Sequence, residues 1–315
     1  MDAERTGAPT SWSHLPNGQL SGRHVSPFSV RHHSPAVVVT VSLALTRLQF
    51  HLAANEAPQR VTGSIGLTVP SLRRIRDRVR RARTELAGTE FDILAESAEI
   101  MTVTCPWGNI FHLYDISVDE RHRGETPRAS PHKMANMHNE GGEYGGHRMA
   151  VRGQPGIRFV EFACRAGTTG AIAEFYERLL GCHVSRSTAP LDSETNSDGK
   201  AICVTIGPGV HFVFTEGQQP SDDVVKQMEG VHACVYVPHF RRTYDLLEKH
   251  GLIWTNPRFT HLDSCDSWEE ACASRTLRFK DIVDLNTGQK VLELEHETRP
   301  LLHGQYMKVP PYTAN

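Results

Sequence analysis

The sequence lacks a long apolar run and several of the short motifs that mark common enzyme classes. Its longest apolar stretch, residues 37–45, contains Thr40 and Ser42 and is far shorter than the roughly 20 residues that span a bilayer. We expect a buried strand there and no membrane span. Phosphate-binding loops, dinucleotide fingerprints and nucleophile elbows are also missing, which argues against the enzyme classes that depend on them.

An excess of one charge sign is absent as well. Lysine and arginine number 34 and acidic residues 36, so the formal net charge is only −2. Such a balance gives no overall attraction to nucleic acid or to a membrane surface. We therefore expect a small-molecule substrate as the partner and nucleic acid as an improbable one, and a homodimer stays open.

Paired cysteines are the third absence. The seven cysteines include no Cys-x-x-Cys pair, and an odd number suits a reducing compartment better than a disulfide framework. We expect buried thiols and a cytoplasmic location. The first fifty-five residues have only Asp2 and Glu4 as acids, which is also the bias of a transit peptide, so targeting to an organelle stays open.

What the chain does contain is two patterned segments, 46–116 and 156–300, among less regular ones. Its 315 residues suit about two domains of ~150 residues each. The composition predicts a poorly ordered segment at 1–45, a Gly-rich linker at 117–155 and a tail at 301–315. Four histidines in the linker lack the close spacing of a metal site and are interpreted as part of a solvated tether.

The segment 156–300 repeats one pattern twice: a strand, a helix and three strands. The first helix begins near Thr168 or Thr169, and glycines end both helices, at Gly181 and Gly251. The expected elements are strands 156–164, 183–187, 200–206 and 210–215 with a helix at 168–180, then strands 231–237, 252–256, 276–284 and 290–296 with a helix at 240–250. We predict an α+β fold in which the paired βαβββ modules form an open, curved sheet with a ligand-binding cleft.

The segment 46–116 follows the same plan as a shortened copy. Residues 48–52 resemble the last strand of one module, and residues 64–115 supply a strand, a helix at 71–86 and three further strands. An opening strand and helix are missing, and nothing in residues 1–36 supplies them. Three explanations stay open: an incomplete domain, structure borrowed from a partner chain, or a faulty gene model.

Four short motifs resemble the vicinal oxygen chelate superfamily, which includes glyoxalase I, bleomycin-resistance proteins and extradiol dioxygenases. They are Phe159-Val160-Glu161-Phe162, Glu174-Phe175-Tyr176 with Leu180-Gly181, Val291-Leu292-Glu293-Leu294, and Pro106-Trp107-Gly108-Asn109-Ile110-Phe111-His112-Leu113-Tyr114. The resemblance covers most of 156–300 and, more weakly, 46–116. It implies an internal duplication and metal ligands on the first and last strands of each module.

The family's ligand positions fall here on Phe159, His211, His232 and Glu293. Two imidazoles and a carboxylate suit Fe, Mn, Ni or Zn, with open positions for a chelating substrate. Phe159 cannot bind a metal, and this departs from the family pattern. Glu161 lies two residues along the same strand face and is the expected catalytic base.

Two functions follow from this assignment. The first is a metal-dependent isomerase, lyase or dioxygenase that acts on a small oxygenated molecule through His211, His232 and Glu293. The second is a metal-free protein that binds or sequesters a small molecule between Phe159, Tyr236 and Trp254. The substrate-binding set is Phe159, Cys234, Tyr236 and Trp254. Ser64 and His112 take the corresponding places in the first half, where we expect no metal.

One local charge anomaly is a helix with seven arginines, residues 73, 74, 76, 78, 80, 81 and 83. An apolar stripe of Leu72, Ile75 and Val79 predicts that this helix packs on the domain with a solvated outer face. Phosphates or an acidic partner are the alternative ligands of such a face.

Overall fold

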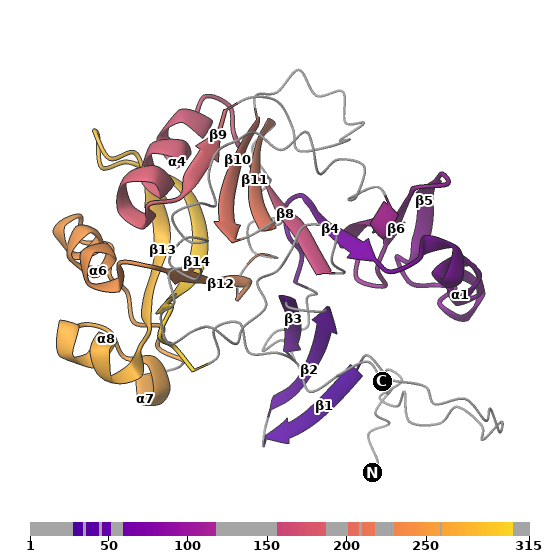
Figure 1. Cartoon of the computed structure of the whole chain (residues 1–315), viewed down its shortest axis with the longest axis horizontal. Helices are drawn as coiled ribbons and strands as arrows, with labels where there is room; N and C mark the ends of the chain where they lie inside the picture. The colour runs from indigo at the N-terminus through magenta and orange to yellow at the C-terminus, as the bar shows by residue number, and fades with distance from the viewer. Residues whose placement is uncertain are drawn as a thin grey trace, which may run out of the picture.

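The computed structural model describes residues 59–117, 156–186, 201–207, 210–217, 228, 230–258 and 260–304, and the backbone of three strands between residues 28 and 51. Three sheets organise this part of the chain (Figure 1). Strands β1 (Phe28–His33), β2 (Ala36–Leu43) and β3 (Thr46–His51) form a three-stranded sheet. Two of these strands thus lie in the segment expected to be poorly ordered, where β-branched valines favour extended backbone.

Residues 64–115 form a βαβββ module. The order is β4 (Ser64–Val69), α1 (Leu72–Glu85), β5 (Asp92–Glu96), β6 (Ile100–Thr104) and β7 (Ile110–Asp115). The start of α1 is held from outside the helix, because the backbone N–H of Leu72 donates to Oδ2 of Asp115 at 2.7 Å. A carboxylate at this end of a helix also complements the helix dipole.

Residues 156–217 form the second module. The order is β8 (Gly156–Arg165), α4 (Thr169–Phe175), the π-helical turn η2 (Tyr176–Leu180), β9 (His183–Ser185), β10 (Ala201–Gly207) and β11 (Val210–Gly217). Gly181 ends the helix as predicted, with φ of 71° in the left-handed region that glycine adopts readily.

The first two modules share one eight-stranded sheet, in the order β5-β6-β7-β4-β8-β11-β10-β9. Their opening strands meet at its centre, where β4 runs antiparallel to β8 with Ile65 opposite Val160 and Gly66 opposite Phe159. The expectation that residues 156–217 pair edge to edge with residues 231–300 is therefore wrong. Gly66 suits this pairing, because a side chain at that position would meet the ring of Phe159.

The third module, residues 232–300, has its own three-stranded sheet in the order β12-β14-β13. Its elements are β12 (His232–Val237), α6 (Phe240–Lys249), α7 (Thr260–Asp263), α8 (Trp268–Ser274), β13 (Leu277–Val283) and β14 (Lys290–Pro300). The predicted strand at 252–256 is not a strand, although the N–H of Trp254 donates to the Arg278 carbonyl of β13 at 2.9 Å. Helices α7 and α8 lie in the segment between α6 and β13 instead. Ser267 and Glu270 form a capping box at the start of α8.

The second and third modules share a core rather than a sheet. Phe175 of α4 contacts Phe279 of β13 at 5.7 Å between ring centres, and the Tyr176 hydroxyl lies 2.7 Å from Nε2 of His296. His296 is fully buried, stacks on Phe279 and lies with Nδ1 2.7 Å from the Leu294 carbonyl. Helix α4 and its π-helical turn thus join the eight-stranded sheet to β13 and β14.

Candidate functional site

The eight-stranded sheet has one face covered by helices and one turned away from them. Alternate residues such as Ile65, Met101 and Phe162 face α1 or α4 in the two hydrophobic clusters. The residues between them point to the opposite side, here called the far face, because side chains alternate along a strand. The far face carries Ser64, Gly66, Thr102, His112, Phe159, Glu161, Thr205, His211 and Thr215.

A row of four residues crosses the centre of the far face. The strand registers place His112 opposite Gly66, Gly66 opposite Phe159, and Phe159 opposite His211. The row is nearly symmetric, since each module supplies a histidine from its last strand. The prediction that Phe159 and His211 occupy matched positions agrees with this register, and His112 completes the row.

Each histidine of the row has a threonine beside it. Nδ1 of His112 lies 3.0 Å from the Thr102 hydroxyl, and Nδ1 of His211 lies 3.4 Å from the Thr205 hydroxyl. These contacts orient both rings, and at His112 the contact leaves Nε2 as the nitrogen available to a ligand. Burial lowers the pKa of His112, although the nearby Glu161 carboxylate acts in the opposite direction.

The ring of Phe159 fills the middle of the row. A Cβ placed on Gly66 would lie 2.3 Å from this ring, so the ring occupies the space that a side chain at position 66 would need. The ring centre is 6.3 Å from that of His112 and 6.4 Å from that of Tyr114, whose ring also carries the Arg158 guanidinium at 4.2 Å. The centre of the far face is therefore aromatic.

Glu161 lies beside this aromatic centre, two residues after Phe159 on the same face of β8. Ser64 donates to its Oε2 at 2.6 Å, and Thr215 donates to its Oε1 at 2.8 Å. Two hydroxyl donors from different modules fix the carboxylate, which still has lone pairs for a ligand. The predicted base is thus held at the junction of the two modules.

The other predicted residues lie on the third module. His232, Cys234 and Tyr236 alternate along β12, and Glu293 begins the matching series on β14. Glu295, rather than Glu293, lies opposite His232. Glu293 instead accepts from Lys290 at 2.6 Å, and this contact lowers its pKa. The ring centre of Trp254 lies 5.3 Å from Nζ of Lys280.

A buried ionic network covers this part of the third module. Arg278 is 2% exposed and contacts three carboxylates: Asp263 at 2.7 Å, Glu295 at 2.8 Å and Glu297 at 3.1 Å. Nε2 of His232 lies 3.9 Å from Glu297. No local sequence pattern predicts this network, although alternating acids at 293, 295 and 297 indicate a charged strand face.

A metal centre is not formed by the residues that the structure describes. His211 belongs to one sheet, and His232 and Glu293 belong to another. No three His, Cys, Asp or Glu side chains of the described segments gather in a group that could hold a metal ion. On the far face, Phe159 and Gly66 take the two middle positions of the row, and neither offers a ligand atom. The side chains as arranged do not fit a divalent metal.

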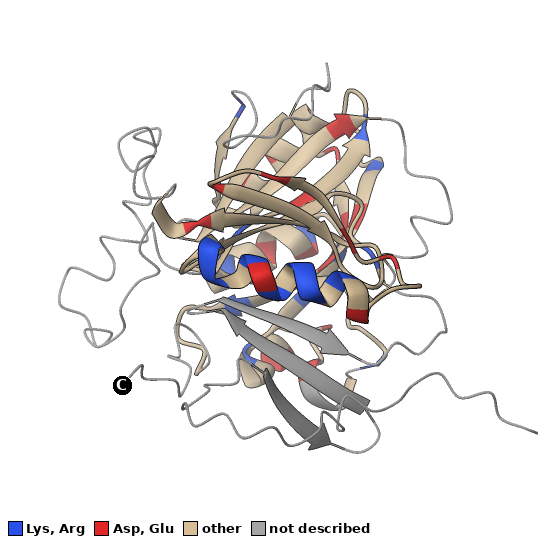
Figure 2. Ribbon diagram, turned by 90° about the vertical axis from the view of Figure 1, so that its right-hand side faces the viewer, with Lys and Arg blue, Asp and Glu red and all other residues tan. Residues whose placement is uncertain are grey.

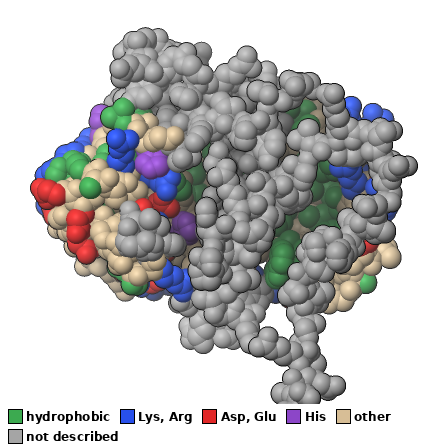
Figure 3. All heavy atoms as spheres, turned by 90° about the horizontal axis from the view of Figure 1, so that it is seen from below, with side chains coloured by type: hydrophobic (Ala, Val, Ile, Leu, Met, Phe, Trp, Pro, Cys, Tyr) green, Lys and Arg blue, Asp and Glu red, His purple; other side chains and the backbone are tan. Residues whose placement is uncertain are grey.

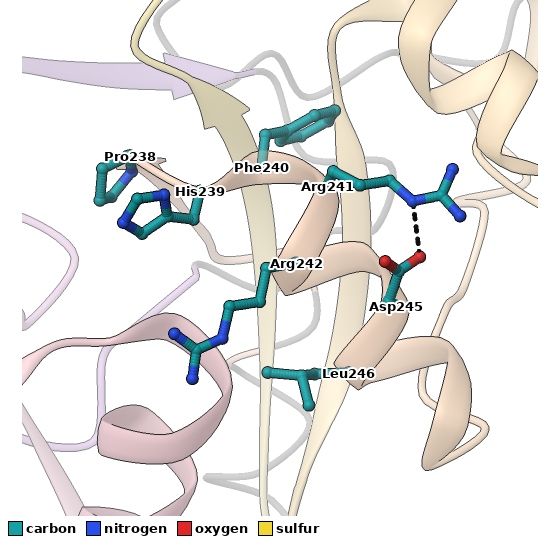
Figure 4. Close-up of a pocket in the computed structure, with 7 residues that line it drawn as sticks. All are labelled: Pro238, His239, Phe240, Arg241, Arg242, Asp245 and Leu246. Atoms are coloured by element: carbon teal, nitrogen blue, oxygen red, sulfur yellow. Dashed lines mark ion pairs between the residues drawn. The ribbon is translucent and has the colours of Figure 1, made fainter.

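A shallow hollow lies elsewhere, at the start of α6. Its lining includes Pro238, His239, Arg242 and Leu246, and also Arg241 and Asp245, which pair with each other at 2.7 Å (Figure 4). It contains none of the predicted site residues. Figure 3 shows a separate group of hydrophobic side chains toward the right-hand side of the molecule.

The described residues contain no helix with the length and apolar character needed to cross a membrane. No protein-family profile matches the sequence, and no curated protein matches it.

Solved structures of three kinds are similar to the chain. Glyoxalase I from Zea mays is 10% identical with a TM-score of 0.43, over 84% of this chain and 78% of that one. A putative dioxygenase from Bacillus subtilis is 10% identical with a TM-score of 0.43, over 86% and 74%. The fosfomycin resistance protein FosX from Mesorhizobium loti is 14% identical with a TM-score of 0.28, over 46% and 90%.

Proposed function

We propose that the far face of the eight-stranded sheet binds a small, ring-containing molecule without a metal ion. The observation that carries this proposal is the ring of Phe159, which lies over Gly66 at the centre of the row between two histidines. An aromatic ring at this point gives a ligand an apolar surface on which to stack.

The polar groups around Phe159 supply orientation. The Glu161 carboxylate accepts hydrogen bonds, so it favours a ligand with a hydroxyl or amino donor. The lowered pKa of His112 favours a neutral imidazole, with one nitrogen donating and the other accepting. We infer a ligand with a planar apolar part and at least one polar donor at its edge.

Binding of 8-anilinonaphthalene-1-sulfonate, followed by its fluorescence, tests the proposal. We expect saturable binding that EDTA does not change and that Phe159→Ala weakens at least ten-fold. Tyr236→Ala is the matched control, since it removes a half-buried aromatic ring from the third module. Loss of binding in Tyr236→Ala with unchanged binding in Phe159→Ala would move the site to the third module, and loss with EDTA would contradict metal-free binding.

A metal-dependent enzyme is the second candidate, and one observation favours it. His112, Glu161 and His211 share the far face and offer two imidazoles and a carboxylate. They do not gather at one point, so this candidate requires them to move together when a metal binds. The set from the sequence, His211 with His232 and Glu293, remains the competing assignment. Metal analysis after dialysis against Mn, Fe, Ni or Zn separates the possibilities. About one equivalent that is lost in His112→Ala supports the far face, and loss in His232→Ala supports the other set. Less than a tenth of an equivalent removes this candidate.

A further inference from the structure

Six of the seven arginines of helix α1 form two stripes, and Arg73 lies between the stripes. The apolar side of α1, with Leu72, Ile75 and Val79, packs on the sheet. At about 100° per residue, each flank of that side carries three arginines within an arc of about 60°. The inner stripe is Arg76, Arg80 and Arg83, and the outer stripe is Arg74, Arg78 and Arg81.

The inner stripe shows what such a row binds. Arg76 and Arg80 pair with Glu96 at 2.8 and 2.9 Å, and Arg83 pairs with Asp92 at 3.0 Å. Both carboxylates belong to strand β5 and lie four residues apart, roughly 13 Å along an extended chain. The three arginines span roughly 10 Å of helix. An extended segment with two acids at this spacing therefore matches three arginines on one helix flank.

The arginines of the outer stripe have nearly the same spacing along the helix as those of the inner stripe, but no acidic strand such as β5 lies beside them among the described residues. Arg74, Arg78 and Arg81 are exposed, and none of them has a carboxylate partner among the residues that the structure describes. Figure 2 shows the arginines of α1 along the front of the molecule. Like charges on neighbouring turns repel one another, so an acidic ligand would stabilise this flank.

We propose that the outer stripe of α1 binds an extended acidic peptide segment of a partner protein, with two carboxylates four residues apart. The inner stripe and β5 are the template for this contact within the same molecule. A membrane surface fits less well, because the apolar side of α1 is already packed on the sheet. A nucleic acid fits less well, because α1 carries no aromatic side chain on which a base could stack.

The test uses the β5 sequence itself as the probe. A fluorescein-labelled, end-capped peptide of residues 91–97 carries both carboxylates at the required spacing. We expect saturable binding to the full chain at low salt, measured by fluorescence anisotropy. The affinity should fall several-fold when the salt concentration of the assay is raised from about 50 to about 300 mM. Arg74→Gln/Arg78→Gln/Arg81→Gln should weaken it at least five-fold without lowering the melting temperature.

The matched control is Arg76→Gln/Arg80→Gln/Arg83→Gln, which removes the same charge from the inner stripe. We expect it to lower the melting temperature and to leave peptide binding within two-fold of the wild type. If this variant does not fold, Arg83→Gln alone serves as the control. Equal weakening by both stripes would overturn the proposal, as would unchanged binding of a peptide with Asn and Gln in place of its acids. Tighter binding of polyuridylate through the outer stripe would assign the surface to nucleic acid and overturn it too.

Discussion

At the scale of single residues, the junction of the first two modules contains a close contact between Gly66 and the ring of Phe159. The two residues lie opposite each other on β4 and β8, and a Cβ on Gly66 would come within 2.3 Å of the ring. Backbone freedom is not the reason for the glycine here, since the close approach of a side chain explains it. The same contact lies at the centre of the sheet and of the far face.

Gly66→Val is therefore expected to destabilise the fold by about 1–3 kcal/mol, as overpacking of a tight contact does. Urea unfolding of the single variants, of Phe159→Ala and of the double variant would measure the coupling between the two positions. We expect the valine to cost much less when Phe159 is already alanine. Equal costs in both backgrounds would show that the ring is not what excludes a side chain at position 66.

His296 is the second residue with a measurable consequence. Burial lowers its pKa to about 4 from the ordinary 6.5, so the unfolded chain takes up the proton first as the pH falls. The stability from the neutral ring is present above about pH 6.5 and is lost as the pH approaches 4. The loss is about 3 kcal/mol at most, since each unit of pKa corresponds to about 1.4 kcal/mol. Urea unfolding at several pH values should show this slope in the wild type and a flatter one in His296→Gln.

At the scale of elements, strands β13 and β14 are joined by charge as well as by backbone hydrogen bonds. Arg278 of β13 reaches Glu295 and Glu297 of β14 and also Asp263 of α7. Its pKa is raised: burial alone would lower it, but the three carboxylates outweigh that effect. This arginine therefore neutralises acids that would otherwise repel one another inside the third module.

Arg278→Met is expected to cost about 3–5 kcal/mol, because removing one partner of a buried ionic group leaves the other charges uncompensated. Arg278→Lys keeps the charge but loses the forked geometry, so we expect a smaller loss. Thermal unfolding of both variants checks this order. Arg241→Met is the control, since its exposed pair with Asp245 should contribute little.

At the scale of the whole molecule, the sequence predicted the modules better than their partners. The alternation of apolar and polar residues identifies β8 and β11, and a helical apolar spacing that ends at a glycine identifies α4, because these signals are local. The strand that pairs with β8 is β4, which comes from a distant part of the chain, and no local pattern contains that information. Glu293 and Glu295 lie on the same strand face, so alternation cannot distinguish them. The register of β12 with β14 does, because it places Glu295 opposite His232.

The shared sheet also predicts the result of cutting the chain between the first two modules. Proteolysis within residues 118–155 should yield two fragments that stay together, because β4 and β8 remain paired and Ser64 and Thr215 both hold Glu161. Size-exclusion chromatography of the nicked protein should show one species with the mass of the intact chain. Gly66→Val should favour separation of the fragments, and separation of the wild-type fragments in native buffer would contradict the shared sheet.

The central pairing of β4 with β8 has a consequence for synthesis on the ribosome. Ser64 and the carboxylate that it binds are 97 positions apart, so the edge of β4 emerges long before its neighbour exists. An unpaired strand edge is a template for wrong partners, including the same edge of another nascent chain. The first module therefore passes through a vulnerable interval in translation, and slow decoding of the codons between the two strands would lengthen it.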